Sequence, residues 1–261
     1  LEHNPGGNHP ERPERLKAII ESLRNDEELL EDIQFQTPSP ATREDIELVH
    51  DSDYVQEVER RSKSGKMLDL DTPISSNTYD LALLAAGGTV GLTKSVYRRD
   101  FENGFALVRP PGHHATRGSG GGFCYFNNIA IAAKKLLLEE NTEKVMIFDF
   151  DSHHGNGTQD IFYSDKSVLY MSFHQNGRTL YPGTGFPSEI GSGEGTGYTV
   201  NIALPPKASD GNYYYALRKF FRPVIEQFDP DALLVSAGID LHEKDPLTQL
   251  KVSTEGIHNI G

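Results

Sequence analysis

Apolar residues in this chain follow two patterns, short continuous runs and longer segments with helical spacing. In the segment 11–32, Leu16, Ile19 and Leu23 fall on one face of a helix. Short runs such as 145–148 are instead typical of buried strands. These patterns predict helices over 11–32, 79–98, 127–140 and 213–228, and strands over 104–108, 145–150, 168–173, 198–203 and 232–236.

The alternation of strands with helices indicates the fold class. Short apolar strands separated by helices are typical of an α/β protein with a mostly parallel sheet that is covered on both faces. No internal repeat, low-complexity tract or linker divides the 261 residues, so we expect a single domain over 1–261. In such sheets ligands bind beyond the carboxyl ends of the strands, which is where the polar motifs of this chain are expected.

The chain is strongly acidic and has one cysteine. Its net charge of -13 argues against nucleic-acid binding and favours cationic substrates or partners, although ordinary solubility is an alternative explanation. Cys124 alone excludes an intrachain disulfide, so we expect a cytoplasmic protein, or a nuclear one in a eukaryote. No apolar run reaches the ~20 residues of a membrane helix, and no signal peptide opens the chain. From its first and last residues we expect the natural chain to continue beyond both ends.

Three ligand-type side chains, Asp149, Asp151 and His153, stand at the carboxyl end of one predicted strand. Side chains alternate between the faces of a strand, so these three point the same way. Asp240 follows another predicted strand, and the carboxyl ends of parallel strands share one edge of the sheet. We therefore predict a metal site built from Asp151, His153 and Asp240. These ligands favour zinc, with iron(II), cobalt and manganese as open alternatives, and Gly155 stands where a second metal would require a carboxylate.

A pair of histidines, His113 and His114, follows the predicted strand 104–108. Imidazole has a reference pKa of about 6.5, which suits acid and base catalysis near neutral pH. Asp149 and Asn156 are candidate partners for the second ring nitrogens, and an Asp partner favours the cationic ring whereas an Asn partner eases deprotonation. The histidines at 3, 9, 50, 174, 242 and 258 lack such a context and are expected at the surface or behind the site.

Two aromatic residues lie in or beside glycine-rich segments. The run 118–122 lacks the Gly-Lys-Ser/Thr ending of a phosphate loop, and we interpret it as backbone that passes close to a pocket. Phe123 follows that run and Tyr181 lies in another glycine-rich loop, so the two rings are candidates for opposite walls of a narrow channel. The alternative is that both are ordinary hydrophobic anchors.

Six motifs stand in an order that is typical of one family. They are His9-Pro10-Glu11-Arg12-Pro13-Glu14-Arg15, Arg-Pro-Pro-Gly-His-His-Ala (109–115), Gly-Phe-Cys-Tyr-Phe-Asn-Asn (122–128), Asp-Phe-Asp-Ser-His-His-Gly-Asn-Gly-Thr-Gln (149–159), Tyr-Pro-Gly-Thr-Gly (181–185), and Asp240 followed by Asp245-Pro246. They resemble the zinc-dependent histone deacetylase family, which includes acetylpolyamine amidohydrolases and acetoin-utilisation proteins. The asparagine at 156 resembles the class II-like branch of that family.

The resemblance implies a three-layer α/β/α fold of the arginase/deacetylase type. It also implies a set of site residues: Asp151, His153 and Asp240 on one Zn2+, His113 and His114 as acid and base with Asp149 and Asn156 behind them, and Gly122, Phe123, Tyr181 and Leu247 along an acetyl-lysine channel. A structural K+ near the Asp149 backbone and Ser172 is a further implication.

The implied reaction is hydrolysis of the amide of N-acetylated lysine to acetate and a free amine. One departure from the family is that no tyrosine follows a Gly-Gly pair before Gly261, and we interpret this as a shortened chain rather than a lost oxyanion donor. Two alternatives stay open. One is an amidohydrolase of acetylated polyamines or other small amides, and the other is a metal-containing module that binds acetyl-lysine without hydrolysis.

Overall fold

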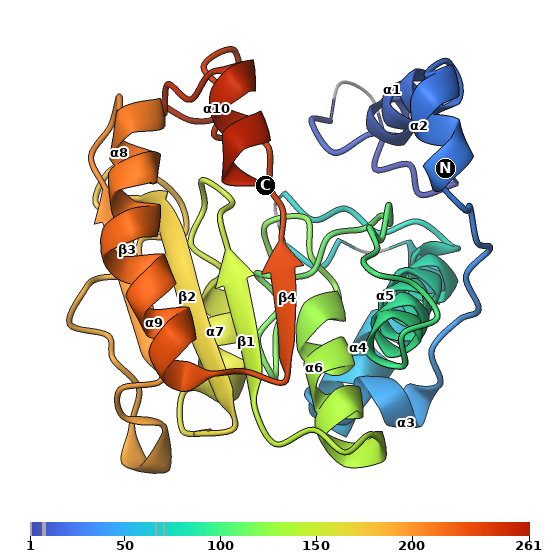
Figure 1. Ribbon diagram of the computed structural model, residues 1–261. Helices are drawn as coiled ribbons and strands as arrows, with labels where there is room; N and C mark the ends of the chain where they lie inside the picture. Colours follow the sequence, from blue (N-terminus) through green and yellow to red (C-terminus); the bar gives the residue numbers. More distant parts are fainter. Residues whose placement is uncertain (1, 7–8, 66, 70) are drawn as a thin grey trace. The chain divides into compact units, whose positions relative to one another are not determined.

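The computed structural model describes residues 2–6, 9–65, 67–69 and 71–261 (Figure 1). The chain divides into an N-terminal unit, Leu1–Lys135, and a C-terminal unit, Leu136–Gly261. The N-terminal unit contains α1 (Pro13–Arg24), α2 (Glu27–Asp32), α3 (Arg43–Ile46), α4 (Ser52–Ser64) and α5 (Thr78–Tyr97), and α6 (Asn128–Glu139) runs across the boundary. The C-terminal unit contains β1 (Val145–Asp149), α7 (Asn156–Phe162), β2 (Val168–Gln175), η1 (Gly193–Gly195), β3 (Thr199–Leu204), α8 (Asp210–Ala216), η2 (Leu217–Phe221), α9 (Arg222–Phe228), β4 (Ala232–Ser236) and α10 (Thr254–Ile260).

Two of the helices predicted in the N-terminal half are confirmed, and one is wrong in its extent. α5 and α6 lie within a residue of the predicted 79–98 and 127–140. The helix predicted over 11–32 is instead two helices, α1 and α2. The carboxylate of Asp26 accepts a hydrogen bond from the backbone N–H of Leu29 at 3.0 Å, so it caps a new helix rather than continuing the first.

The strand predicted over 104–108 is wrong. The backbone N–H of Leu107 donates to the carbonyl of Phe105 at 3.1 Å, and that of Val108 donates to Ala106 at 2.9 Å. These three-residue turns occupy backbone groups that a β-ladder would need. The described part of the N-terminal unit also contains no strand with which the segment pairs, and the Phe105 side chain is 66% exposed.

The C-terminal unit is built on a parallel sheet with the strand order β3-β2-β1-β4. All four strands were predicted and are confirmed, with β2 extending two residues further than expected. Every residue of β1 and β2 is buried, as expected for central strands of a parallel sheet covered on both faces. Asp149, the last residue of β1, lies in register with Ser172 of β2 and Ser236 of β4.

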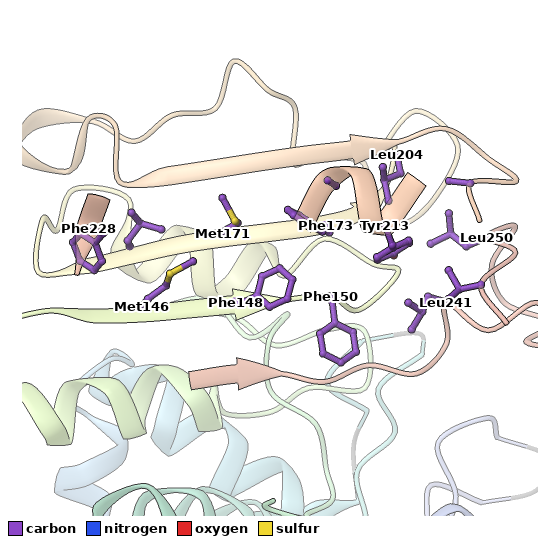
Figure 2. Packing of buried hydrophobic residues seen from close by; sticks show 14 residues of the cluster. Met146, Phe148, Phe150, Met171, Phe173, Leu204, Tyr213, Phe228, Leu241 and Leu250 are labelled. Carbon is purple, nitrogen blue, oxygen red and sulfur yellow. The ribbon is translucent and has the colours of Figure 1, made fainter. Parts of the chain in front are cut away.

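Helices cover both faces of this sheet. The segment α8-η2-α9 runs from Asp210 to Phe228, three residues earlier than the predicted start, because the side chains of Ser209 and Asn212 form a capping box there. Figure 1 shows α8 and α9 in front of the sheet and α7, which packs against β2, behind it. A cluster of buried residues lies on the α8/α9 side and includes Met146, Phe148, Phe150, Met171, Phe173, Leu204, Tyr213, Phe228, Leu241 and Leu250 (Figure 2).

Candidate active site

Asp151, His153 and Asp240 come together at the carboxyl end of the sheet. One ligand atom from each lies within 4.8 Å of the others. Asp151 and His153 follow β1, and Asp240 follows β4, the strand that pairs with β1. Neighbouring parallel strands thus bring two carboxylates and one imidazole to the same place, as expected from side-chain alternation and from the shared carboxyl edge of a parallel sheet.

Both carboxylates lie within hydrogen-bonding distance of the same ring nitrogen of His153. Nδ1 of His153 lies 3.1 Å from Oδ1 of Asp151 and 2.7 Å from Oδ2 of Asp240. Burial alone would lower the pKa of His153, but its hydrogen bonds with both carboxylates raise that pKa to about 10. Burial and the neighbouring Asp151 charge raise the pKa of Asp240 to about 6. Two partly buried carboxylates beside one imidazole favour a bound positive charge, and this donor set fits a divalent cation such as zinc.

Backbone groups hold the two carboxylates in place. The N–H of Ser152 donates to Asp240 at 2.8 Å, and the N–H of His153 donates to Asp151 at 2.8 Å. Gly238 is a further contributor that the sequence interpretation missed. A Cβ atom at that position would lie 1.9 Å from Oδ2 of Asp151, so only glycine allows the carboxylate this position. The signal was a glycine two residues after the end of β4 and two residues before the candidate ligand Asp240.

Asp149 and Asn156 lie on either side of the metal-type cluster along the chain. Asp149 is fully buried at the end of β1, and its carboxylate accepts hydrogen bonds from the Asp151 N–H at 3.1 Å and the Tyr170 hydroxyl at 3.4 Å. Asn156 is the first residue of α7. The two residues therefore stand at the ends of the regular elements that flank Asp151 and His153.

His113 and His114 lie together in the N-terminal unit. Their ring centroids are 4.0 Å apart with an interplanar angle of 47°, and the residues are only 8% and 6% exposed. Side chains that begin α6 hold their loop, because Asn127 donates to the carbonyl of Ala115 at 3.1 Å and Asn128 donates to that of Pro110 at 3.1 Å. The structure therefore brings the histidine pair together in one unit and the metal-type triad together in the other.

An ion pair joins the start of the chain to the same loop. Glu11 and Arg109, both almost fully buried, pair through both guanidinium Nε and Nη2, the latter at 2.7 Å. Such a bidentate pair fixes geometry as well as charge. The two motifs that contain Glu11 and Arg109 were identified in the sequence, but their contact was not.

The predicted channel residues have distinct environments. Gly122 and Phe123 have φ angles of 54° and 70°, and a left-handed conformation in a bulky residue such as Phe123 is uncommon and concentrated at functional sites. Tyr181 is 44% exposed, and its ring centroid lies 6.4 Å from that of His153. Leu247 is also 44% exposed, and its N–H donates to Asp245 at 2.8 Å.

Comparison with known proteins identifies the family. The family model of the histone deacetylase domain matches residues 9–261. The chain belongs to the histone deacetylase family. It is therefore a deacetylase of that family, a metal-dependent amidohydrolase, and the family implies zinc at a site for which the chain supplies the Asp-His-Asp group.

Relatives of this deacetylase occur in archaea and plants. A probable deacetylase of Archaeoglobus fulgidus is 45% identical over 98% of this chain and 71% of the relative. The chloroplastic histone deacetylase 14 of Arabidopsis thaliana is 39% identical over 100% of this chain, which spans 65% of that relative. Among solved structures, the HDA15 HD domain aligns with a TM-score of 0.92 and 38% identity, covering 98% of this chain and 75% of that one. The α/β fold with a parallel sheet is thus that of the family.

Among the described residues, no helix of this deacetylase has the length and apolar character needed to cross a membrane.

Proposed function

We propose that residues 1–261 act as one catalytic domain that hydrolyses the amide of N-acetylated lysine to a free amine and acetate. The observation that carries the proposal is the Asp151, His153 and Asp240 cluster at the carboxyl ends of two adjacent strands. The names of the relatives, probable deacetylase and histone deacetylase, support an acetylated substrate.

Each predicted site residue has a role in this proposal. Asp151, His153 and Asp240 hold one Zn2+, which supplies Lewis-acid polarisation and a water of lowered pKa when bound. One ring nitrogen of the His113 and His114 pair takes a proton from the attacking water, and one returns a proton to the leaving amine nitrogen. Asp149 and Asn156 are the orienting groups for those rings. Gly122, Phe123, Tyr181 and Leu247 line the path of the acetyl-lysine side chain.

A structural potassium ion beside the Asp149 backbone and Ser172 is part of the same proposal. Register supports it, because Asp149 and Ser172 are paired across β1 and β2 and both are fully buried. A backbone carbonyl and a hydroxyl offer oxygen ligands, which suit hard cations.

Acetylated polyamines are the second candidate substrate. The net charge of -13 is the observation that favours them, because a polyamine is cationic and an acidic protein attracts it. A panel of acetylated peptides and acetylated polyamines, compared by kcat/KM with the full-length gene product, separates the two substrate classes.

Removing a ligand tests the metal assignment. We expect Asp151→Ala and His153→Ala each to abolish zinc uptake and deacetylation together, because each leaves a site with only two protein ligands. Zinc content measured by plasma emission spectrometry and acetate release measured on an acetyl-lysine peptide are the two readouts. Asp231→Ala is the control, since that carboxylate accepts hydrogen bonds from the N–H groups of Glu143 and Lys144 before β1 and touches no candidate ligand. Full zinc occupancy in either ligand variant would contradict the assignment.

A further inference from the structure

We infer that Glu189, Gln159 and Thr184 are positioning residues that clamp the loop carrying Tyr181, and thereby set the position of one wall of the substrate channel. The inference rests on the proposed function, because it takes Tyr181 as a channel residue. The loop 181–189 connects β2 to the segment before β3, and all contacts that carry the inference lie within the C-terminal unit.

Glu189 closes the loop on itself. Its Oε2 atom accepts a hydrogen bond from the Gly185 N–H at 3.1 Å, and its Oε1 atom accepts one from the Phe186 N–H at 3.1 Å. The Glu189 N–H in turn donates to the Phe186 carbonyl at 2.8 Å. Hydrogen bonds from backbone N–H groups to a carboxylate are stronger than those between neutral groups, so one side chain fixes the conformation of this turn.

Gln159 of α7 attaches the closed loop to the sheet. Its Nε2 atom donates to Oε2 of Glu189 at 2.7 Å, and its Oε1 atom accepts from Asn201 of β3 at 2.7 Å. Asn201 also donates to the Glu189 carbonyl at 3.1 Å. A helix and a strand therefore hold Glu189 from two directions.

Two buried histidines hold the other part of the loop. Oε1 of Gln159 only accepts hydrogen bonds, so Nε2 of His154 donates to it at 3.1 Å, and in the neutral ring Nδ1 accepts from the Thr184 hydroxyl at 2.8 Å. Burial lowers the pKa of His174 to about 4, so this ring is neutral, and its Nε2 donates to the Gly185 carbonyl at 2.8 Å.

The contact between loop and rings is tight. Gly185 has a φ of 81°, and a Cβ atom there would lie 2.4 Å from His174 and 2.6 Å from His154. The network thus begins at His154, the residue after the candidate ligand His153, and ends at Thr184, three residues from Tyr181. It couples the candidate metal loop to the exposed Tyr181 ring, which lies edge-on to His153.

Glu189→Gln tests the clamp with almost no change of shape. The new amide group must turn its NH2 toward either the Phe186 N–H or the Gly185 N–H and the Gln159 amide, so at least one donor loses its acceptor. Thr184→Val is a second isosteric variant that removes one hydroxyl. Asp231→Ala is the matched control, because it deletes a carboxylate that accepts two backbone N–H groups at the opposite end of the strands.

The first readout needs no catalysis. The 261 residues contain no tryptophan, so Tyr181→Trp in the full-length gene product places a reporter on the loop, to be compared with the parent spectrum. We expect Glu189→Gln, and less strongly Thr184→Val, to increase acrylamide quenching of Trp emission at this position and to lower its anisotropy. Asp231→Ala should leave both values unchanged. Quenching and anisotropy in both isosteric variants equal to those of the control would overturn the clamp.

The second readout is kinetic and keeps Tyr181. We expect Glu189→Gln to raise KM for an acetyl-lysine peptide about tenfold, which corresponds to 1.4 kcal/mol of binding, with kcat within about twofold of the parent. We also expect Glu189→Gln to make the channel wall more mobile and so to increase kcat/KM for a propionyl-lysine peptide relative to kcat/KM for an acetyl-lysine peptide. An unchanged KM and acyl selectivity in both isosteric variants overturns the inference while the deacetylase function stands. If the parent protein is inactive but the two isosteric variants still show the expected changes in fluorescence, the proposed function is overturned and the clamp remains supported.

Discussion

His50 supports the loop of His113 and His114 through both of its ring nitrogens. Its Nε2 atom accepts a hydrogen bond from the Asn127 N–H at 2.9 Å, and its Nδ1 atom therefore donates to the Thr116 carbonyl at 2.8 Å. Burial lowers the pKa of His50 to about 4. Between pH 6.5 and pH 4 the unfolded chain binds a proton there that the folded chain does not, so stability falls as the pH falls through this window.

The variant His50→Gln isolates this effect, because glutamine keeps one donor and one acceptor but does not titrate. We expect the free energy of unfolding of the parent protein to fall by about 3 kcal/mol more than that of the variant between pH 7 and pH 4. Urea unfolding followed by circular dichroism at pH 7, 5.5 and 4 provides the measurement. Equal pH dependence in the two proteins would show that His50 carries no such linkage.

Single residues differ in how far the sequence reveals their role. The proximity of Asp151, His153 and Asp240 was predictable because each closely follows an apolar run typical of a strand, and such runs are local signals. His50, expected at the surface or behind the site, proved to be a fully buried support of a loop 66 residues away. The roles of Gly238 and Glu189 likewise depend on contacts that no local pattern encodes.

At the scale of elements, α5 contains two glycines whose replacement by alanine should have opposite effects on the stability of the protein. A Cβ atom on Gly87 would lie 2.1 Å from the Ser39 carbonyl oxygen and 2.3 Å from the Ala41 nitrogen, which are backbone atoms that cannot move aside cheaply. A Cβ atom on Gly91 would meet nothing within 4 Å. We expect Gly87→Ala to destabilise the protein by about 3 kcal/mol through overpacking, and Gly91→Ala to stabilise it by about 1 kcal/mol through helix propensity. Urea midpoints of the two variants provide the comparison, and a shift of the same sign in both would contradict it.

Elements with their own periodicity were predicted well, and those that depend on a neighbour were not. The four strands of the parallel sheet are apolar runs between turn residues, and they pair with one another in the C-terminal unit. The segment 104–108 has the same apolar pattern, but strand formation requires a partner, and its backbone forms three-residue turns instead. The division of 11–32 followed from one capping aspartate, Asp26, within an otherwise continuous helical pattern.

At the scale of the whole molecule, the candidate catalytic residues are divided between the two units. The N-terminal unit supplies the histidine pair with Gly122 and Phe123, and the C-terminal unit supplies the metal-type triad with Tyr181 and Leu247. The sequence motifs follow one another without a linker, and a single domain over 1–261 stays a prediction. Zinc should therefore stabilise the two units unequally, because the three candidate ligands all lie in the C-terminal unit.

Zinc removal tests whether the metal stabilises the C-terminal unit more than the N-terminal unit. A ligand that binds only the folded state adds about 2.7 kcal/mol of stability at a free concentration of 100 Kd. We expect chelation to increase hydrogen exchange in peptides that cover β1, β4 and the loops after them, with a smaller change in α4, because local opening follows local stability. Exchange mass spectrometry of the zinc-loaded and chelated protein measures this, and Asp151→Ala should exchange like the chelated parent in both conditions. A response of equal size in α4 and in the ligand loops would show that the metal is not held by the C-terminal unit alone.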